Sequence, residues 1–152
     1  MSIRKNKKWG FYGHSTINHN YEVKTINGDK VVIDNATGLM WQQSGNWKAI
    51  EWNEALDWLN KFNRHGYAGY YDWRLPTVEE ASSLLESGKK NGDLYIAPVF
   101  DRLQKRIWTG DICSDGRGSG EAYRVNFKKG SVHRYVFDIF YYVRLVRSSP
   151  VK

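Results

Sequence analysis

GYYDWRLPTVEE, residues 69–80, is the most informative segment of this chain, because it combines three aromatic side chains, a charge pair, a proline and a helix start. Pro76 cannot donate to a strand ladder, and it favours an extended conformation of Leu75. Thr77 followed by Glu80 has the capping-box pattern, so we expect a helix to begin there. The segment therefore predicts an extended approach to a helix.

The charged residues of this segment flank a tryptophan. Asp72 and Arg74 lie on either side of Trp73 and could form a buried, hydrogen-bonded pair with each other. We expect Trp73 to be buried and Arg74 to bind a carboxylate or backbone carbonyls. We interpret the segment as a structural corner rather than an active site.

Elsewhere the pattern predicts one domain of α and β elements. Apolar residues at three- and four-residue spacing predict a helix over 51–64, and a second helix is expected over 78–86. Asn27-Gly28-Asp29 predicts a turn between two strands. The expected strands cover residues 21–26, 30–34, 39–42, 106–109, 121–128, 131–137 and 140–147.

The ends of the chain differ from its middle. Residues 1–19 are polar and aromatic without a period, and we expect a basic, aromatic arm that is flexible unless a partner or the domain ties it down. Residues 20–148 form the predicted domain. No run approaches the ~18 apolar residues that span a bilayer, so we expect no membrane insertion. Residues 1–10 lack the apolar region of a signal peptide, which favours a cytoplasmic chain or one whose leader has been removed.

Positive charge is concentrated in the C-terminal third. Residues 1–101 carry twelve Lys and Arg against twelve Asp and Glu, whereas residues 102–152 carry eleven against four, which accounts for the whole net charge of +7. A field of one sign favours anionic partners, namely acidic or sulfated sugars, nucleic acid or an anionic membrane surface.

The strand expected over 121–128 supplies the candidate ligand-binding residues. Strand alternation places Arg124, Asn126 and Lys128 on one face, opposite Tyr123, Val125 and Phe127. If the first face is outward, cations would face solvent there and across the following hairpin; the alternative is that they only solvate the strand. The candidate set is Arg124, Asn126, Lys128, Lys129, His133 and Arg134.

Residues suited to catalysis or metal binding are few. Cys113 is the single cysteine, so no intrachain disulfide can form, and none of the four histidines is near it in sequence as a base. We predict a non-enzymatic protein with no catalytic residues and no cofactor. The glycine-rich loop Asp111–Glu121 holds three carboxylates and could bind Ca²⁺, but a surface loop without metal is the preferred interpretation.

Three motifs together resemble the Lcl C-terminal domain family. DNATGLMWQ at 34–42, the segment at 69–80 and YVRLVR at 142–147 follow the order of that family over roughly residues 30–148. The resemblance implies a compact α+β domain similar to the C-type lectin and formylglycine-generating-enzyme folds. The namesake is a bacterial surface adhesin whose domain binds sulfated glycosaminoglycans.

The resemblance also implies structural roles. Many members carry a cysteine at each of the positions of Leu59 and Leu145, so we expect these two leucines to touch in the core. Trp41 lies in the opening motif and is expected to be structural. Arg144 and Arg147 match the closing motif and are expected to pair with carboxylates such as Asp34 or Asp72.

We therefore predict an α+β, C-type-lectin-like domain, with two helices packed on one twisted, mainly antiparallel sheet whose first and last strands are adjacent. The predicted function is binding of an anionic glycan at a bacterial cell surface, through Arg and Lys contacts and aromatic stacking. The alternatives are a nucleic-acid-binding domain and a scaffold that displays loops to protein partners. Homo-oligomers are compatible with each of these, and the ligand and the cell compartment stay open.

Overall fold

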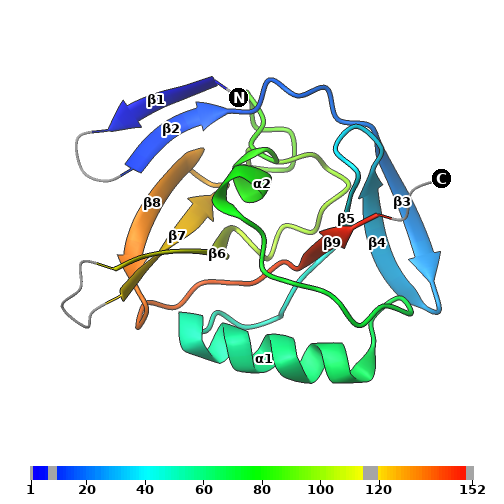
Figure 1. Ribbon diagram of the computed structural model, residues 1–152. Coiled ribbons are helices and arrows are strands. Elements are labelled where there is room, and N and C mark those ends of the chain that lie inside the picture. Colours follow the sequence, from blue (N-terminus) through cyan, green and yellow to red (C-terminus); the bar gives the residue numbers. More distant parts are fainter. Residues whose placement is uncertain (1, 7–9, 115–119, 150–152) are drawn as a thin grey trace.

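The computed structural model describes residues 2–6, 10–114 and 120–149, and within these ranges it has two helices and nine strands (Figure 1). The helices are α1 (Trp52–His65) and α2 (Val78–Ser82). The strands are β1 (Ser2–Asn6), β2 (Gly10–His14), β3 (Tyr21–Ile26), β4 (Asp29–Asp34), β5 (Leu39–Gln42), β6 (Arg106–Ser114), β7 (Gly120–Asn126), β8 (Ser131–Val136) and β9 (Val146–Ser148).

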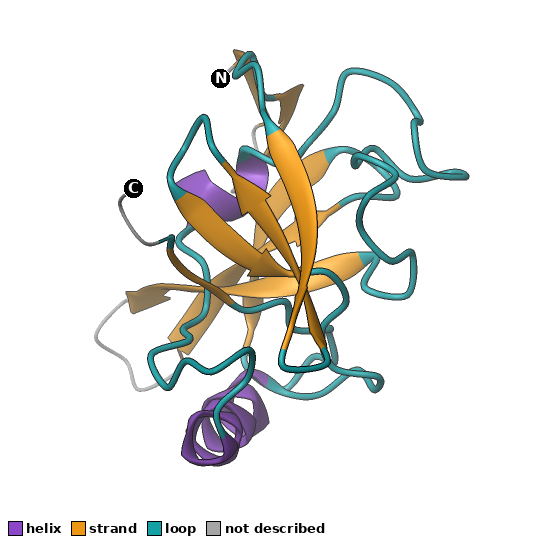
Figure 2. Ribbon diagram, turned by 90° about the vertical axis from the view of Figure 1, so that its right-hand side faces the viewer, coloured by secondary structure: helices purple, strands orange, loops and turns teal. Residues whose placement is uncertain are grey.

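The strands form two antiparallel sheets. One has the order β1-β2-β8-β7-β6 and the other β3-β4-β5-β9. The α+β class is confirmed. The prediction of a single sheet with adjacent first and last strands is wrong, because β9 pairs with β5, with Trp41 opposite Val146. Figure 2 shows α1 outside the strands at one end of the molecule.

The N-terminal segment joins the larger sheet. Residues 2–6 pair with residues 10–14, and β2 in turn pairs with β8, with Phe11 opposite Val132. We expected an arm that is flexible unless the domain ties it down, and these backbone pairings are such a tie. A strand held by main-chain hydrogen bonds needs no side-chain period, so residues 1–19 carry no periodic pattern that predicts these strands.

The two helices begin as the sequence predicts, but α2 is shorter. Glu51 and Glu54 form a capping box at the start of α1, and Thr77 and Glu80 form one at the start of α2. We expected α2 to reach residue 86, yet it ends at Ser82. The Ser82 and Ser83 hydroxyls donate to carbonyls three residues back, and local bonds of this kind compete with helix continuation.

The core consists of two clusters of apolar side chains. Trp41 lies in the cluster between the sheets, whereas Trp73 and Leu145 lie in the cluster beneath α1. Leu59 packs against the second cluster but is only half-buried. The expected burial of Leu145 is confirmed, and that of Leu59 is confirmed in part. No helix among the described residues is long and apolar enough to cross a membrane.

Candidate functional site

The corner at residues 69–80 is a structural joint. Trp73 is 2% exposed, and its ring nitrogen donates to the Tyr67 carbonyl at 3.0 Å. Arg74 binds the Glu80 carboxylate, which confirms the expected carboxylate partner. The expected pair between Asp72 and Arg74 is wrong. Asp72 instead contacts Arg147 of β9, whereas Arg74 contacts Glu80 of α2.

Asp72 pairs instead with the last strand. Arg147 donates to both of its carboxylate oxygens, at 2.7 and 3.1 Å, and the guanidinium lies 3.6 Å from the centre of the Tyr70 ring. The expectation that Arg147 binds a carboxylate such as Asp72 is confirmed. This pair and the two backbone hydrogen bonds between Arg74 and Val146 hold the corner against β9.

Arg144 has carbonyl partners rather than a carboxylate, so that part of the prediction is wrong. Its guanidinium is fully buried over the Phe100 ring and donates to the carbonyls of Ser44, Gln43 and Asp101. Burial lowers the pKa of Arg144, although the carbonyl dipoles compensate its charge. The side chain holds the 43–44 loop. Residues 140–147 were expected to form one strand, but β9 covers only Val146–Ser148, and the Val143 and Leu145 backbones donate to the side chains of Asn46 and Gln42.

Two of the six candidate binding residues are buried, which corrects the predicted outward face. Arg124 is 6% exposed and Asn126 is 2% exposed. The Arg124 guanidinium lies against the rings of Tyr135 and Tyr141, 4.5 and 5.0 Å from their centres, and donates to the Tyr135 hydroxyl. The side-chain amide oxygen of Asn126 accepts hydrogen bonds from the backbone of Lys128 and Lys129 and so shapes the hairpin turn.

The candidates on β8 are half-buried. Burial and the Arg124 charge lower the pKa of His133, which favours its neutral form at pH 7. Arg134 donates to the sulfur of Cys113 on β6 at 2.6 Å. Neither side chain therefore offers a freely exposed cation, and of the six candidates only Lys128 and Lys129 are exposed.

The turn that carries these two lysines meets other basic segments. The Phe127 backbone donates to the Lys105 carbonyl at 2.8 Å, and the Tyr95 backbone donates to the Phe127 carbonyl at 2.7 Å. The loop before Tyr95 is closed by a bond from Lys90 to the Leu94 carbonyl. We define the turn surface as the basic side chains of these segments: Lys89, Lys90, Arg102, Lys105, Lys128 and Lys129.

The turn surface is exposed and mostly positive. All its members are exposed except Lys105, which is half-buried, and the Arg102 side chain lies against Gly92 in the same loop. The acidic residues nearest to it in sequence are Glu86, Asp93 and Asp101. The Glu86 carboxylate lies 3.9 Å from the Lys90 ammonium. The sequence alone showed Lys89-Lys90 only as a dipeptide in a charge-balanced half of the chain, without a signal that links it to the distant hairpin.

The loop considered for calcium is described only in part. The Asp111 carboxylate accepts a hydrogen bond from the Val78 backbone and so caps the start of α2. Residues 115–119, with Asp115, lie outside the described residues. Among the residues that the structure describes, no three His, Cys, Asp or Glu side chains are grouped to hold a metal ion.

Comparison with known proteins identifies one family. The model of the Lcl C-terminal domain matches residues 30–147, which cover most of the chain from β4 to β9. No curated protein matches the chain.

Proposed function

The chain belongs to the Lcl C-terminal domain family, and we propose that it is a non-enzymatic domain that binds anionic glycans, sulfated or acidic, through the turn surface. The observation that carries this proposal is that three segments joined by backbone hydrogen bonds at Tyr95, Lys105 and Phe127 carry mostly exposed basic residues, at 89–90, 102–105 and 128–129. Several ammonium groups and a guanidinium on one exposed surface favour a ligand with repeated negative charges.

The basic side chains have two modes of contact. Lys acts as a point charge that can adjust to sulfates at different spacings, whereas the planar guanidinium of Arg102 can bind one sulfate or carboxylate through two parallel hydrogen bonds. Such contacts need no deep pocket, and a linear polyanion can lie across the surface. The resulting affinity should depend on salt, because screening shortens the reach of each charge.

Family membership extends the proposal to the fold and the setting. We propose that the two helices and antiparallel sheets are a form of the C-type-lectin-like fold, and that the domain works in adhesion at a bacterial cell surface. The family resemblance supports both statements. An experimental structure whose strand connections differ from those of C-type lectins would contradict the first.

Heparin chromatography tests the glycan proposal. The Lys128→Glu/Lys129→Glu variant should elute from heparin at clearly lower salt than the unchanged chain. The matched control is Lys61→Glu/Arg64→Glu, which changes the net charge equally on α1, where both residues are exposed. Equal elution of the two variants would mean that net charge alone governs retention and would contradict a turn-surface site.

A competition experiment distinguishes glycan binding from nucleic-acid binding. If sugar contacts contribute, single-stranded DNA should displace bound heparin poorly at equal total charge. Equal displacement would favour a general polyanion-binding domain, which is the nucleic-acid alternative.

A further inference from the structure

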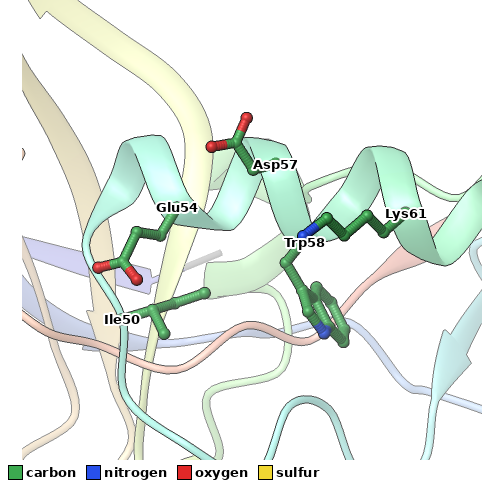
Figure 3. A pocket seen from close by; sticks show the side chains of 5 residues that line it. All are labelled: Ile50, Glu54, Asp57, Trp58 and Lys61. Carbon is green, nitrogen blue, oxygen red and sulfur yellow. The ribbon is translucent and has the colours of Figure 1, made fainter.

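A pocket of about 290 Å³ lies beside α1, well separated in sequence from the turn surface. It is lined by Ile50, Glu54, Asp57, Trp58 and Lys61. Figure 3 shows the Trp58 ring and the Glu54 carboxylate extending from α1 towards the side of Ile50. The helical members are three or four residues apart and so share one side of α1.

The aromatic wall of the pocket is held in place. The Trp58 ring is half-buried and packs 4.9 Å from the Phe62 ring. Ile50 is held by two backbone hydrogen bonds with Tyr141, at 2.8 and 3.0 Å. A rigid indole with one free face is suited to bind a flat apolar surface at low entropic cost.

The polar groups of the pocket select against anions. Glu54 and Asp57 supply two carboxylates, which repel a sulfate or a carboxylate. Lys61 supplies an ammonium group, which offsets one of these two negative charges. A neutral molecule with several hydroxyl groups suits all three side chains, because its hydroxyls can donate to the carboxylates and accept from the ammonium. An organic cation could also pair with the carboxylates, so it is the competing ligand.

A second exposed ring lies near this pocket in the chain. Trp47 is 80% exposed, the most exposed large hydrophobic side chain described. Its loop is fixed at both ends, by a bond from the Asn46 backbone to the Val143 carbonyl and by the pairing of Ile50 with Tyr141. The exposed indole is therefore available as a stacking surface.

We infer that the pocket beside α1 binds the ring of a neutral saccharide, which stacks its C–H face on Trp58 while its hydroxyls bind Glu54, Asp57 and Lys61. Trp47 supplies a stacking surface for a neighbouring sugar. This inference does not rest on the proposed anion-binding function, because the two sites consist of different residues and the pocket is proposed for an uncharged ligand.

The test is calorimetric titration of the whole chain at about 0.5 M NaCl, where charges on the turn surface are screened. The probes are neutral tri- and tetrasaccharides of glucose, mannose, galactose and N-acetylglucosamine, with choline as the cationic comparison. At least one saccharide should bind and choline should not. No saccharide binding at millimolar concentration, or binding of choline alone, overturns the inference.

Variants then assign the site. Trp58→Ala should weaken saccharide binding at least about tenfold, because it removes the aromatic surface on which the sugar ring stacks. Because Trp58 also contacts the core, the exposed Asp57→Ala variant is the second measure and should weaken binding several-fold without a change in stability. Lys128→Glu/Lys129→Glu is the control and should bind as the unchanged chain does. Full affinity in the Asp57 and Trp58 variants overturns the site.

Discussion

Arg74 and Glu80 form a two-point ion pair, with Nη1 2.6 Å from Oε1 and Nη2 2.7 Å from Oε2. The same Glu80 oxygen, Oε1, accepts from the Thr77 backbone at 2.9 Å. The Arg74 backbone also exchanges two hydrogen bonds with Val146 of β9, at 2.9 and 3.0 Å. One carboxylate therefore caps α2 and, through Arg74, connects the helix start to the last strand.

Removal of this carboxylate should destabilise the domain. Glu80→Ala removes a cap and leaves Arg74 without its partner, and we expect a cost of about 1–3 kcal/mol in the free energy of unfolding. Glu79→Ala is the matched control, because Glu79 is exposed on the same helix turn, and it should stay within about 0.5 kcal/mol. Urea unfolding of both variants measures the difference. Equal midpoints would show that the pair contributes no net stability.

The pair should also make stability depend on pH. Burial raises the pKa of Glu80, but the hydrogen bonds from Arg74 and Thr77 lower it more, so its folded pKa lies below the unfolded value. The stability that it contributes is thus complete above the unfolded pKa of about 4.3 and is lost as pH falls through the lower, folded pKa. Unfolding measured from pH 7 down to pH 3 should show this loss, and Glu80→Gln should have a shallower acid slope. An unchanged slope would contradict the assignment.

Asp34, which is more buried than Glu80, should also stabilise the domain at neutral pH and lose this contribution in acid. Burial raises its pKa, but hydrogen bonds from Asn20, His19, Thr37 and Ala36 together lower it. Asp34→Asn should therefore lose stability at neutral pH and lose part of the acid dependence as well. Denaturation of this variant at pH 7 and pH 3 measures both effects. A variant whose deficit is the same at both pH values would show that Asp34 acts through its shape alone.

Leu59 and Leu145 differ in burial. Leu145 is fully buried, so Leu145→Ala should cost about 2–5 kcal/mol. Leu59 is half-buried against the same cluster, and Leu59→Ala should cost clearly less, since part of the removed surface is already in water. Thermal and urea unfolding of both variants compare the two. A larger cost for Leu59 would contradict the packing described for α1.

Local patterns predicted the elements whose cause is local. The Thr77–Glu80 capping box and the turn at Asn27 and Gly28, where φ is 53° and 83°, were both expected from short motifs. The second sheet was not, because the pairing of β9 with β5 joins segments about a hundred residues apart. No spacing rule within one segment can reveal such a partner.

The proposed binding surface likewise depends partly on local patterns and partly on long-range contacts. Alternation along β7 predicted which residues share a face, but it could not show that Tyr141, from a later segment, covers Arg124. Lys89 and Lys90 were likewise invisible as neighbours of the β7–β8 turn until the bond between Tyr95 and Phe127 placed their loop beside it. Long-range contacts therefore determine both the burial of Arg124 and the position of the turn surface.

Charge reversal at Arg124 and at the turn should therefore have opposite consequences. Arg124→Glu places a carboxylate beside the rings of Tyr135 and Tyr141. We expect a loss of about 3–5 kcal/mol in the free energy of unfolding, as when one partner of a buried ion pair is removed. Lys128→Glu/Lys129→Glu changes two exposed side chains and should leave the free energy of unfolding within about 0.5 kcal/mol per residue while it weakens retention on heparin. Arg124→Met, which keeps an apolar chain between the rings, separates stability from binding and should elute from heparin at nearly the salt of the unchanged chain. A stable Arg124→Glu protein that has lost its retention would show that Arg124 contacts the ligand and that the binding surface extends along β7.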